Sequence, residues 1–566
     1  MKRSFPAAVT LVLVLAAPFA AKADPGSTAG FTTVPPRPPF TLVGHDPLYG
    51  RGMNAAPAIY KNWMYVGNRT DGSPHHPHPG VLVVDISDPG HPFVFSEIGA
   101  PDEGAVSETS RELRVWPEQN LLMVMNFTCS AIIHACTSAA DAAGSLTPNI
   151  KFYDLSGDNA GSPKLIATYV PPPVPLRPQG VTVPGQSVPV TPHEMFLWVD
   201  PKNPGRALLY YTGPTTSLTR PNLVITDISK AREGKFTDVA QWKGTDLFPQ
   251  DVLDNNDVRL HSIGVSTDGK RTYLAYLGGG FLVLDTSDFA KNTANPTVKL
   301  VTPIANRVPS QTAIGTHSSV KLPGRPYVLT TDEVYGQVLN PAFGEHGCPW
   351  GWVRIIDVSD EAHPKIVSEF KQAQNDASYC DSPDGQDPQN VYFTSFASHN
   401  PTLTRNLAFI TWHSDGLIAV DISDPVHPTQ AGAFKADPLA SVATEDPALS
   451  MGREKVVAWS YPIIKDGLIY FVDVRNGLYV VRYNGPYADE VSGISFLEGN
   501  SNLGNARELD LARYQSSHRT AVRGLRQTRT SLPLPSTGVD DGRSFAALLL
   551  AIAVALATRM RRIARH

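Results

Sequence analysis

The stretch VLVVDISDPGHP, at Val81–Pro92, returns twice along the chain in nearly the same form, and this repetition decides the fold. The two close copies are VRIIDVSDEAHP at Val353–Pro364 and LIAVDISDPVHP at Leu417–Pro428. Weaker copies are KFYDLS at Lys151–Ser156, LVITDIS at Leu223–Ser229, LVLDTSD at Leu282–Asp288 and LYVVRY at Leu478–Tyr483, where Arg482 replaces the aspartate. Repetition on this scale predicts a modular architecture.

One repeat, Arg259–Ile304, contains four short runs rich in β-branched and aromatic residues, separated by Gly and Asp-Gly turn signals. Four-stranded units repeated around an axis are the blades of a β-propeller. We therefore predict an all-β fold, a seven-bladed β-propeller over residues 50–489. Phe40–Gly44 or Val491–Phe496 would supply the strand that closes the ring. The alternative is an array of two-sheet β-sandwiches.

The repeated phrase resembles that of the LVIVD-repeat proteins, a family of bacterial surface or secreted proteins. The resemblance covers about residues 50–483 and implies a β-propeller. It implies little about activity, since fold alone does not fix function.

Both ends of the chain carry the pattern of an exported protein. Lys2 and Arg3, an apolar run and the A-x-A site at 21–23 predict a signal peptide at residues 1–23, followed by a lead-in at 24–49. At the other end, residues 534–566 contain LPSTG, an apolar stretch and the basic tail RMRRIARH, an order that resembles a cell-wall sorting signal. That resemblance implies cleavage between Thr537 and Gly538 by a sortase and attachment to peptidoglycan.

The alternative for this C-terminus is a short transmembrane anchor with its arginines on the cytoplasmic side. Either interpretation places the repeats outside the cytoplasm. The polar, Arg-rich residues 490–533 are interpreted as a linker that holds the propeller away from the surface.

Four cysteines in an exported chain favour disulfides. Three pairings are possible, and we favour Cys129–Cys136 and Cys348–Cys380. The net charge of −5 gives no reason to expect a nucleic-acid partner. We expect a monomer with an extracellular ligand that the sequence does not identify.

Aligning the repeats shows that histidine recurs at one position, the start of the innermost strand. The chain has only 16 histidines, yet four of the seven equivalent positions are histidine. Because the innermost strands of a propeller line its channel, these side chains should meet at one mouth. The candidate metal ligands are His193, His261, His317 and His399.

The second strand of each repeat returns to the same face, so the residues at its end should join this group. On this face we take three residues as candidate catalytic residues: Glu112, at the inner-strand position of the second repeat, and Glu333 and His413, at the ends of second strands. The other residues expected to bind a ligand at the mouth are Arg111, Asn126, Glu194 and Asp473.

Three interpretations of this group stay open. Imidazoles with carboxylates are good ligands for Zn, Cu or Fe. The same groups can form an acid–base site, or they can line a polar, water-filled channel. The functions predicted are ligand binding at a His-rich channel mouth or, alternatively, a metal-dependent oxidoreductase or hydrolase. The sequence contains no Walker loop, no G-x-S-x-G and no H-E-x-x-H motif.

Overall fold

The computed structural model describes residues 38–73, 75–101, 108–126, 129, 134–136, 148–175, 184–188, 190–213, 222–255, 258–311, 315–336 and 347–511. All its strands lie in the compact unit that begins at Pro39. The predicted signal peptide and the sorting signal with Thr537 and Gly538 lie outside the described residues. No helix within those ranges is both long and apolar enough to cross a membrane.

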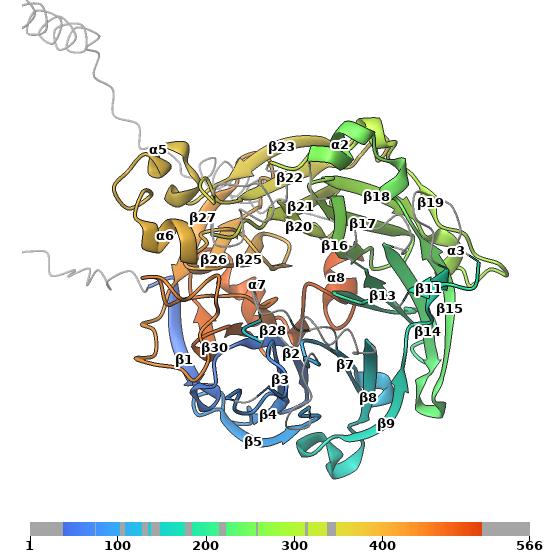
Figure 1. Cartoon of the computed structure of the whole chain (residues 1–566), viewed down its shortest axis with the longest axis horizontal. Coiled ribbons are helices and arrows are strands. Elements are labelled where there is room, and N and C mark those ends of the chain that lie inside the picture. Colours follow the sequence, from blue (N-terminus) through green and yellow to red (C-terminus); the bar gives the residue numbers. More distant parts are fainter. Residues whose placement is uncertain are drawn as a thin grey trace, which may run out of the picture. The chain divides into compact units, whose positions relative to one another are not determined.

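The expected all-β fold of four-stranded antiparallel units is confirmed, and Figure 1 shows these sheets arranged one after another around a common centre. Three sheets cover the first part of the chain: β2(Asn54–Tyr60), β3(Trp63–Asn68), β4(Val81–Asp85) and β5(Phe93–Ile98); β6(Glu112–Trp116), β7(Leu121–Asn126), β8(Asn149–Asp154) and β9(Lys164–Tyr169); and β12(Met195–Val199), β13(Ala207–Thr212), β14(Leu223–Lys230) and β15(Lys235–Trp242).

Two further units share one sheet because β17 also pairs with β20 at a single position. They are β16(Val258–Val265), β17(Arg271–Leu277), β18(Phe281–Asp285) and β19(Lys299–Leu300), followed by β20(Thr316–Lys321), β21(Tyr327–Asp332), β22(Val353–Asp357) and β23(Lys365–Phe370). The next sheet is β24(Pro401–Leu403), β25(Leu407–Trp412), β26(Gly416–Asp421) and β27(Thr429–Phe434).

The last sheet contains strands from both ends of the described chain. β28(Ile463–Lys465), β29(Leu468–Asp473) and β30(Gly477–Tyr483) are consecutive, and β1(Phe40–Asp46) pairs with β30 as its outer strand. The second candidate for that place, Val491–Phe496, does not take it. β31(Phe496–Leu497) pairs instead with β28, on the opposite edge of the sheet.

The repeated phrase marks the end of the third strand of each unit and the turn after it. In the three close copies, the first aspartate accepts a hydrogen bond from the backbone N–H of the serine two residues later, at 2.8 Å for Asp85, Asp357 and Asp421. The second aspartate of each copy bonds the histidine of the x-H-P step. These side-chain-to-backbone bonds fix the turn.

Helices are short and lie in the connections. They are α2(Gln250–Asn255), α3(Ser287–Ala290), α5(Ala377–Cys380), α6(Pro388–Phe393), α7(Ala488–Ser492) and α8(Ala506–Leu511), and a two-stranded hairpin joins β10(Val174–Pro175) to β11(Ser187–Val188).

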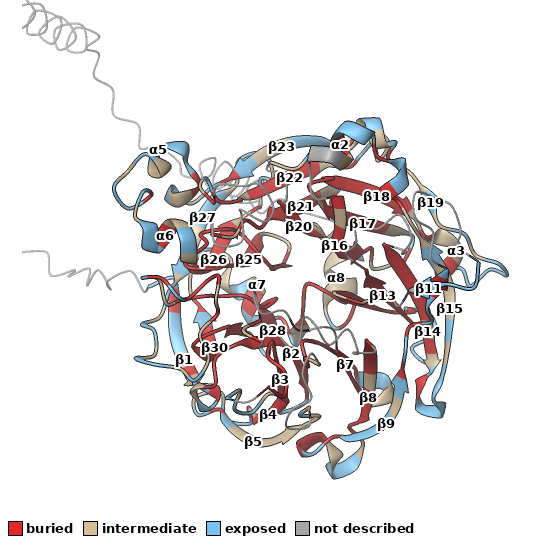
Figure 2. Ribbon diagram, in the orientation of Figure 1, coloured by how far each residue is buried: buried red, intermediate tan, exposed pale blue. Residues whose placement is uncertain are grey.

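The hydrophobic core lies between neighbouring sheets. Met123 and Phe152 of one sheet, for example, pack in a cluster with Leu197 and Leu209 of the next. Figure 2 shows the inner strands buried, while outer strands such as β5 and β9 carry exposed residues. Each unit is therefore held on both faces by apolar contact.

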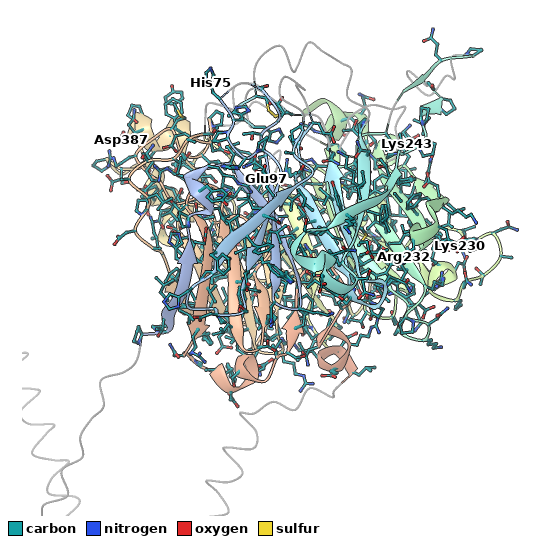
Figure 3. The ribbon with its side chains drawn as sticks, turned by 90° about the horizontal axis from the view of Figure 1, so that it is seen from below. His75, Glu97, Lys230, Arg232, Lys243 and Asp387 are labelled. Carbon is teal, nitrogen blue, oxygen red and sulfur yellow. A yellow bond between two sulfur atoms is a disulfide. The ribbon has the colours of Figure 1, made fainter. Side chains whose placement is uncertain are left out.

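Residues 490–511 belong to this fold, so the expected linker does not begin at residue 490. Beyond β31, Ser501 forms a parallel bridge with Leu197, and Asp510 accepts a hydrogen bond from the backbone of Gly324. Leu197 lies within the inner strand β12, and Gly324 follows the inner strand β20. Figure 3 shows His75 at one end of the molecule and the red C-terminal helices at the opposite end.

Asn502 makes three hydrogen bonds to the backbone of the fold. Its Oδ1 accepts from Val199 N at 2.8 Å, and its Nδ2 donates to the carbonyls of Val199 and Thr267 at 2.8 and 3.2 Å. Asn502→Ala leaves these buried backbone groups unsatisfied, so we expect it to lower the free energy of unfolding by about 2 kcal/mol. Urea unfolding tests this against exposed Asn203→Ala, and equal midpoints for the two variants would refute it.

Candidate functional site

Four histidines line up where the inner strands begin. His261 and His317 lie on β16 and β20, and His193 and His399 lie two residues before β12 and β24. Their rings follow one another, with centroid separations of 4.5 Å for His193–His261, 4.0 Å for His261–His317 and 4.1 Å for His317–His399. The histidines at the recurring sequence position therefore lie next to one another in the structure.

Glu333 and His413 join this row from the second strands, directly after β21 and β25. Glu333 Oε1 lies 3.3 Å from His399 Nε2 and 3.2 Å from His413 Nε2, and its Oε2 lies 3.4 Å from His317 Nε2. One carboxylate thus faces three imidazoles. All four side chains are at most 5% exposed.

The hydrogen bonds on the far side of each ring determine which nitrogen carries the proton. His399 Nδ1 lies 2.6 Å from the carbonyl of Trp459, which only accepts, so Nδ1 donates. His413 Nδ1 lies 2.9 Å from Ser395 Oγ, whose own proton goes to the carbonyl of Val334 at 2.5 Å. In the neutral form of both rings, Nε2 is therefore a lone pair aimed at Glu333.

His317 is oriented in the same way through a longer chain of bonds. Its Nδ1 lies 2.8 Å from Ser318 Oγ, and that hydroxyl donates to Asn400 Oδ1 at 3.1 Å. Asn400 Nδ2 donates to the carbonyl of Trp459 at 2.9 Å, which fixes the amide. His317 Nδ1 must then donate to Ser318, and its Nε2 also presents a lone pair.

The pKa shifts of these side chains indicate which of them are charged. Burial, followed by the neighbouring imidazoles, holds the pKa of His317 and of His399 well below the usual range, so both are neutral at pH 7. Burial raises the pKa of Glu333, but nearby His317 and His413 outweigh it and the net pKa is lowered. An ionised Glu333 carboxylate therefore faces the neutral imidazoles of His317 and His399.

Such an arrangement is electron-rich and suits a cation. Within the described residues, Glu333 Oε1, His399 Nε2 and His413 Nε2 are buried without a hydrogen-bond partner. Donors placed tetrahedrally around a transition-metal ion at about 2.0–2.1 Å stand about 3.3 Å apart, and the three contacts of Glu333 measure 3.2 to 3.4 Å. Glu333, His317 and His399 lie within 4.8 Å of one another and fit a metal ion.

A second carboxylate, Glu194, flanks this group. Its Oε1 lies 4.0 Å from His317 Nε2 and 3.8 Å from His261 Nδ1. Burial, with the nearby charge of Glu112 as the next cause, raises the pKa of Glu194 to about 8. Glu194 is therefore mainly protonated at pH 7, unlike Glu333.

His193 lies at the edge of the row. Its Nε2 is 2.9 Å from His261 Nε2, so one of the two donates to the other. His261 Nδ1 is 3.0 Å from Ser262 Oγ. The two rings bind each other more closely than they approach Glu333, so of the four predicted ligands only His317 and His399 reach that carboxylate.

An aromatic and cationic cluster adjoins the other side of the row. The ring of Trp459 lies 4.1 Å from that of His399 and 5.3 Å from that of His413. The guanidinium groups of Arg69 and Arg111 lie 4.2 and 5.9 Å from the centre of the same indole. The predicted mouth residue Arg111 thus lies beside the group.

The other predicted residues have different surroundings. Asp473 accepts hydrogen bonds from the backbone N–H groups of Val457, Arg475 and Asn476, so it holds a turn. Asn126 Nδ2 donates to Asn149 at 2.7 Å.

Glu112 is a buried carboxylate held between two arginines. It lies 3.5 Å from Arg114 and 3.9 Å from Arg111. Of the predicted catalytic residues, only Glu333 and His413 therefore contact the histidine row directly.

Both favoured disulfides, Cys129–Cys136 and Cys348–Cys380, are present. The first fixes a loop in which His134 Nε2 accepts from Arg111 Nη1 at 3.0 Å. Sequence reasoning missed His134, because it lies outside the repeat. Asp71 lies near Cys129 and Cys136, but their sulfurs are bonded to each other.

The LVIVD repeat model matches residues 76–98 and 403–436. No curated protein matches the chain in sequence. Among solved structures, Sqt1 of Chaetomium thermophilum bound to the N-terminus of ribosomal protein L10 is 12% identical, covering 78% of this chain and 90% of its own, with a TM-score of 0.40.

The periplasmic gluconolactonase PpgL of Pseudomonas aeruginosa is 11% identical, covering 76% and 98% of the two chains, with a TM-score of 0.41. We take no binding or catalytic property from either structure. The chain contains LVIVD repeats in an all-β fold of four-stranded antiparallel sheets.

Proposed function

We propose that this chain is an exported seven-bladed β-propeller that binds a transition-metal ion at the inner ends of its strands and presents that ion to a ligand. The blade count is supported by the four-stranded units from β2 to β30 and by the pairing of β1 with β30. Such a pairing joins the first and last parts of the repeat region, as closure of a ring requires.

The single observation that carries the metal proposal is the position of Glu333. Its carboxylate faces the Nε2 atoms of His317, His399 and His413 at 3.2 to 3.4 Å. With His317 and His399 neutral, their lone pairs and the Glu333 carboxylate repel one another in this buried site unless a cation lies among them. An ion among them converts the repulsion into coordination.

The imidazoles of His317 and His399 and the carboxylate of Glu333, with His413 beside them, suit Zn, Cu or Fe rather than Ca or Mg, which prefer oxygen. Bonds from Nδ1 to Trp459, Ser318 and Ser395 hold the rings in the ligating tautomer, as is usual for metal-bound histidine. When bound, such an ion supplies a Lewis acid or a redox centre. A metal-dependent oxidoreductase or hydrolase is accordingly the second candidate function.

The location of the protein remains a prediction from its sequence. Export by the signal peptide and attachment to peptidoglycan at Thr537 agree with the two disulfides, which favour an oxidising compartment.

The metal proposal is tested by stripping the full chain with a chelator and dialysing it against Co²⁺ or Zn²⁺. We expect one tightly held ion per chain, and an affinity at least about 100-fold lower in His317→Ala and His399→Ala, since each loses a ligand. His427→Ala, at an exposed turn histidine, is the matched control. The site would be refuted if the wild-type chain retained no ion, or if its affinity for the ion equalled that of His399→Ala.

A further inference from the structure

A cavity of about 60 Å³ lies further along the inner strands than the histidine row. The residues of β16, β20 and β24 that line it include Val265, Lys321 and Leu403, each four positions after a histidine of the row. Because a strand rises about 3.3 Å per residue, this spacing corresponds to roughly 13 Å along the strand. The cavity is therefore separate from the proposed metal site.

The C-terminal segment of the described chain closes this cavity. Residues 497–510 supply part of its lining, and Figure 1 shows α8 near β16. Asp510 fastens the segment, since it accepts hydrogen bonds from the backbone N–H of Gly324 at 2.8 Å and from the hydroxyl of Thr267. Two parts of the chain that lie far apart in sequence therefore build the cavity together.

The cavity has an apolar interior and a charged edge. Phe196, Leu403 and Leu497 line it and are each 3% exposed. Lys321 and Asp510 also line it, and they form an ion pair at 3.8 Å in which the side chains are 26% and 25% exposed. Solvent therefore reaches the edge with the ion pair but not the apolar side chains.

One buried carboxyl group lies among these apolar side chains. Glu498 lines the cavity, is 5% exposed and has the hydroxyl of Ser501 as a hydrogen-bond partner. Arg114 acts on Glu498 through its charge, while its guanidinium lies 3.5 Å from Glu112 and donates to the carbonyl of Met195 at 2.7 Å. Burial outweighs both Arg114 and Ser501 and raises the pKa of Glu498. A carboxylate can accept about four hydrogen bonds, so a donor within the cavity would stabilise the ionised form.

We propose that this cavity binds a short primary alkylammonium ion, whose NH₃⁺ group donates to Glu498 while its carbon atoms contact Phe196, Leu403 and Leu497. An ammonium group has three donors, and it supplies the opposite charge that a buried carboxylate requires. The apolar side chains favour the burial of methylene groups. This inference goes beyond the proposed metal site and does not depend on it.

The volume of the cavity limits the length of the ion. One ordered water needs about 10–15 Å³ of such a cavity, and a methylene or ammonium group is of similar size. A cavity of about 60 Å³ therefore holds about four to six non-hydrogen atoms. Ethylammonium and propylammonium are within this limit, whereas hexylammonium exceeds it.

Ligand-observed NMR on the full chain in chelator tests the proposal. Ethylammonium, propylammonium, hexylammonium, propan-1-ol and propionate are titrated separately at constant ionic strength. We expect propylammonium to bind at least about 10-fold more tightly than propan-1-ol, which lacks the charge, and than propionate, which Glu498 repels. Hexylammonium should bind more weakly than propylammonium because it does not fit.

Four variants locate the binding site. Glu498→Gln keeps the shape of the side chain but removes its charge, so it should weaken propylammonium binding at least about 10-fold. Glu508→Gln is the matched control, because Glu508 is exposed on α8 and its carboxylate accepts from Asn505. Ala506→Leu should abolish binding by filling the cavity. His399→Ala, at the proposed metal site, should bind propylammonium as wild type does.

Each outcome supports or overturns the proposal. It is overturned if wild type does not bind propylammonium, or if Glu498→Gln or Ala506→Leu binds it with wild-type affinity. Tighter binding of propionate than of propylammonium overturns the assignment to a cation, and loss of binding in His399→Ala would place the ion at the histidine row instead. Thermal unfolding shows whether each variant is folded, and if Glu498→Gln is not, Ala506→Leu and the comparison with propan-1-ol still decide. Because no metal is present in these titrations, failure of the metal site leaves their result unchanged.

Discussion

Glu333→Gln is expected to weaken transition-metal binding by at least about 1,000-fold, or about 4 kcal/mol, while leaving the ion-free protein at least as stable as wild type. The carboxylate is the only charged member of the ligand set, and it lies within 3.4 Å of three imidazole nitrogens. Replacing it removes the charge that attracts the ion. The glutamine amide can also donate a proton to the Nε2 lone pairs that Glu333 leaves unsatisfied.

Glu333→Gln is expected to weaken metal binding without destabilising the ion-free protein, and this combination makes the prediction specific. Thermal unfolding in chelator should give a midpoint for Glu333→Gln equal to or above that of wild type. With ion in excess, wild type should gain stability, by about 4 kcal/mol at 1,000 times its dissociation constant, and the variant almost none. The control is Glu233→Gln, at an exposed carboxylate that pairs with Lys235. A variant that is destabilised in chelator, or that still gains stability with ion, would contradict the assignment of Glu333.

His261→Gln is expected to make the ion-free protein less sensitive to acid. Burial, followed by the charges of Arg111 and Arg259, lowers the pKa of His261 to about 3, whereas an unfolded chain has a histidine pKa of about 6.5. The unfolded state therefore takes up a proton that the folded state refuses. The contribution of His261 to stability is complete above pH 6.5 and is lost as the pH falls from 6.5 toward 3.

The size of this loss of stability follows from the one additional proton that the unfolded state binds. Each pH unit well below pH 6.5 corresponds to about 1.4 kcal/mol, but half of the unfolded chains already carry the proton at pH 6.5, so between pH 6.5 and pH 4.5 wild type should lose about 2.3 kcal/mol more than His261→Gln. Denaturant unfolding in chelator at several pH values measures this difference. Exposed His427→Gln should keep the wild-type slope. Parallel slopes for wild type and His261→Gln would show that His261 is protonated in the folded protein.

The repeated phrase made the strands predictable because it fixes two things at once. Its β-branched residues form a strand buried on both faces, and its aspartates bond the turn that follows, as at Asp85 and Asp421. Counting from the phrase also located His261 and His317. Each unit runs through its inner and second strands before it reaches the phrase, so equivalent positions coincide in space although the units differ in length.

The partners that each histidine of the row contacts could not be predicted from the sequence. The sequence placed His193 among the metal ligands and His413 among the catalytic candidates, but His193 bonds to His261 while His413 faces Glu333. That difference depends on partners such as Ser395, which lies outside the repeat and orients His413. Local spacing carries no information on such contacts.

The error at residues 490–511 has a related cause. Asn500 and Asn502 give this segment the composition of a linker, yet both are buried, and Asn502 satisfies the backbone of Val199. A polar side chain that serves as a partner for buried backbone groups looks, in sequence, like one that is solvated.

The sheet that contains β1 and β31 sets the time at which the protein can finish folding. Its strands come from residues 40–46, 463–483 and 496–497, so it forms only when both extremes of the repeat region are present. Contacts across such a long chain segment carry a high closure entropy and form late. The bond from His399 to the carbonyl of Trp459 comes from the segment just before this sheet. Under the proposed export from the N-terminus, the proposed ligand set therefore cannot mature until the final repeat has emerged, and an incompletely translocated chain should be unable to acquire the proposed ion.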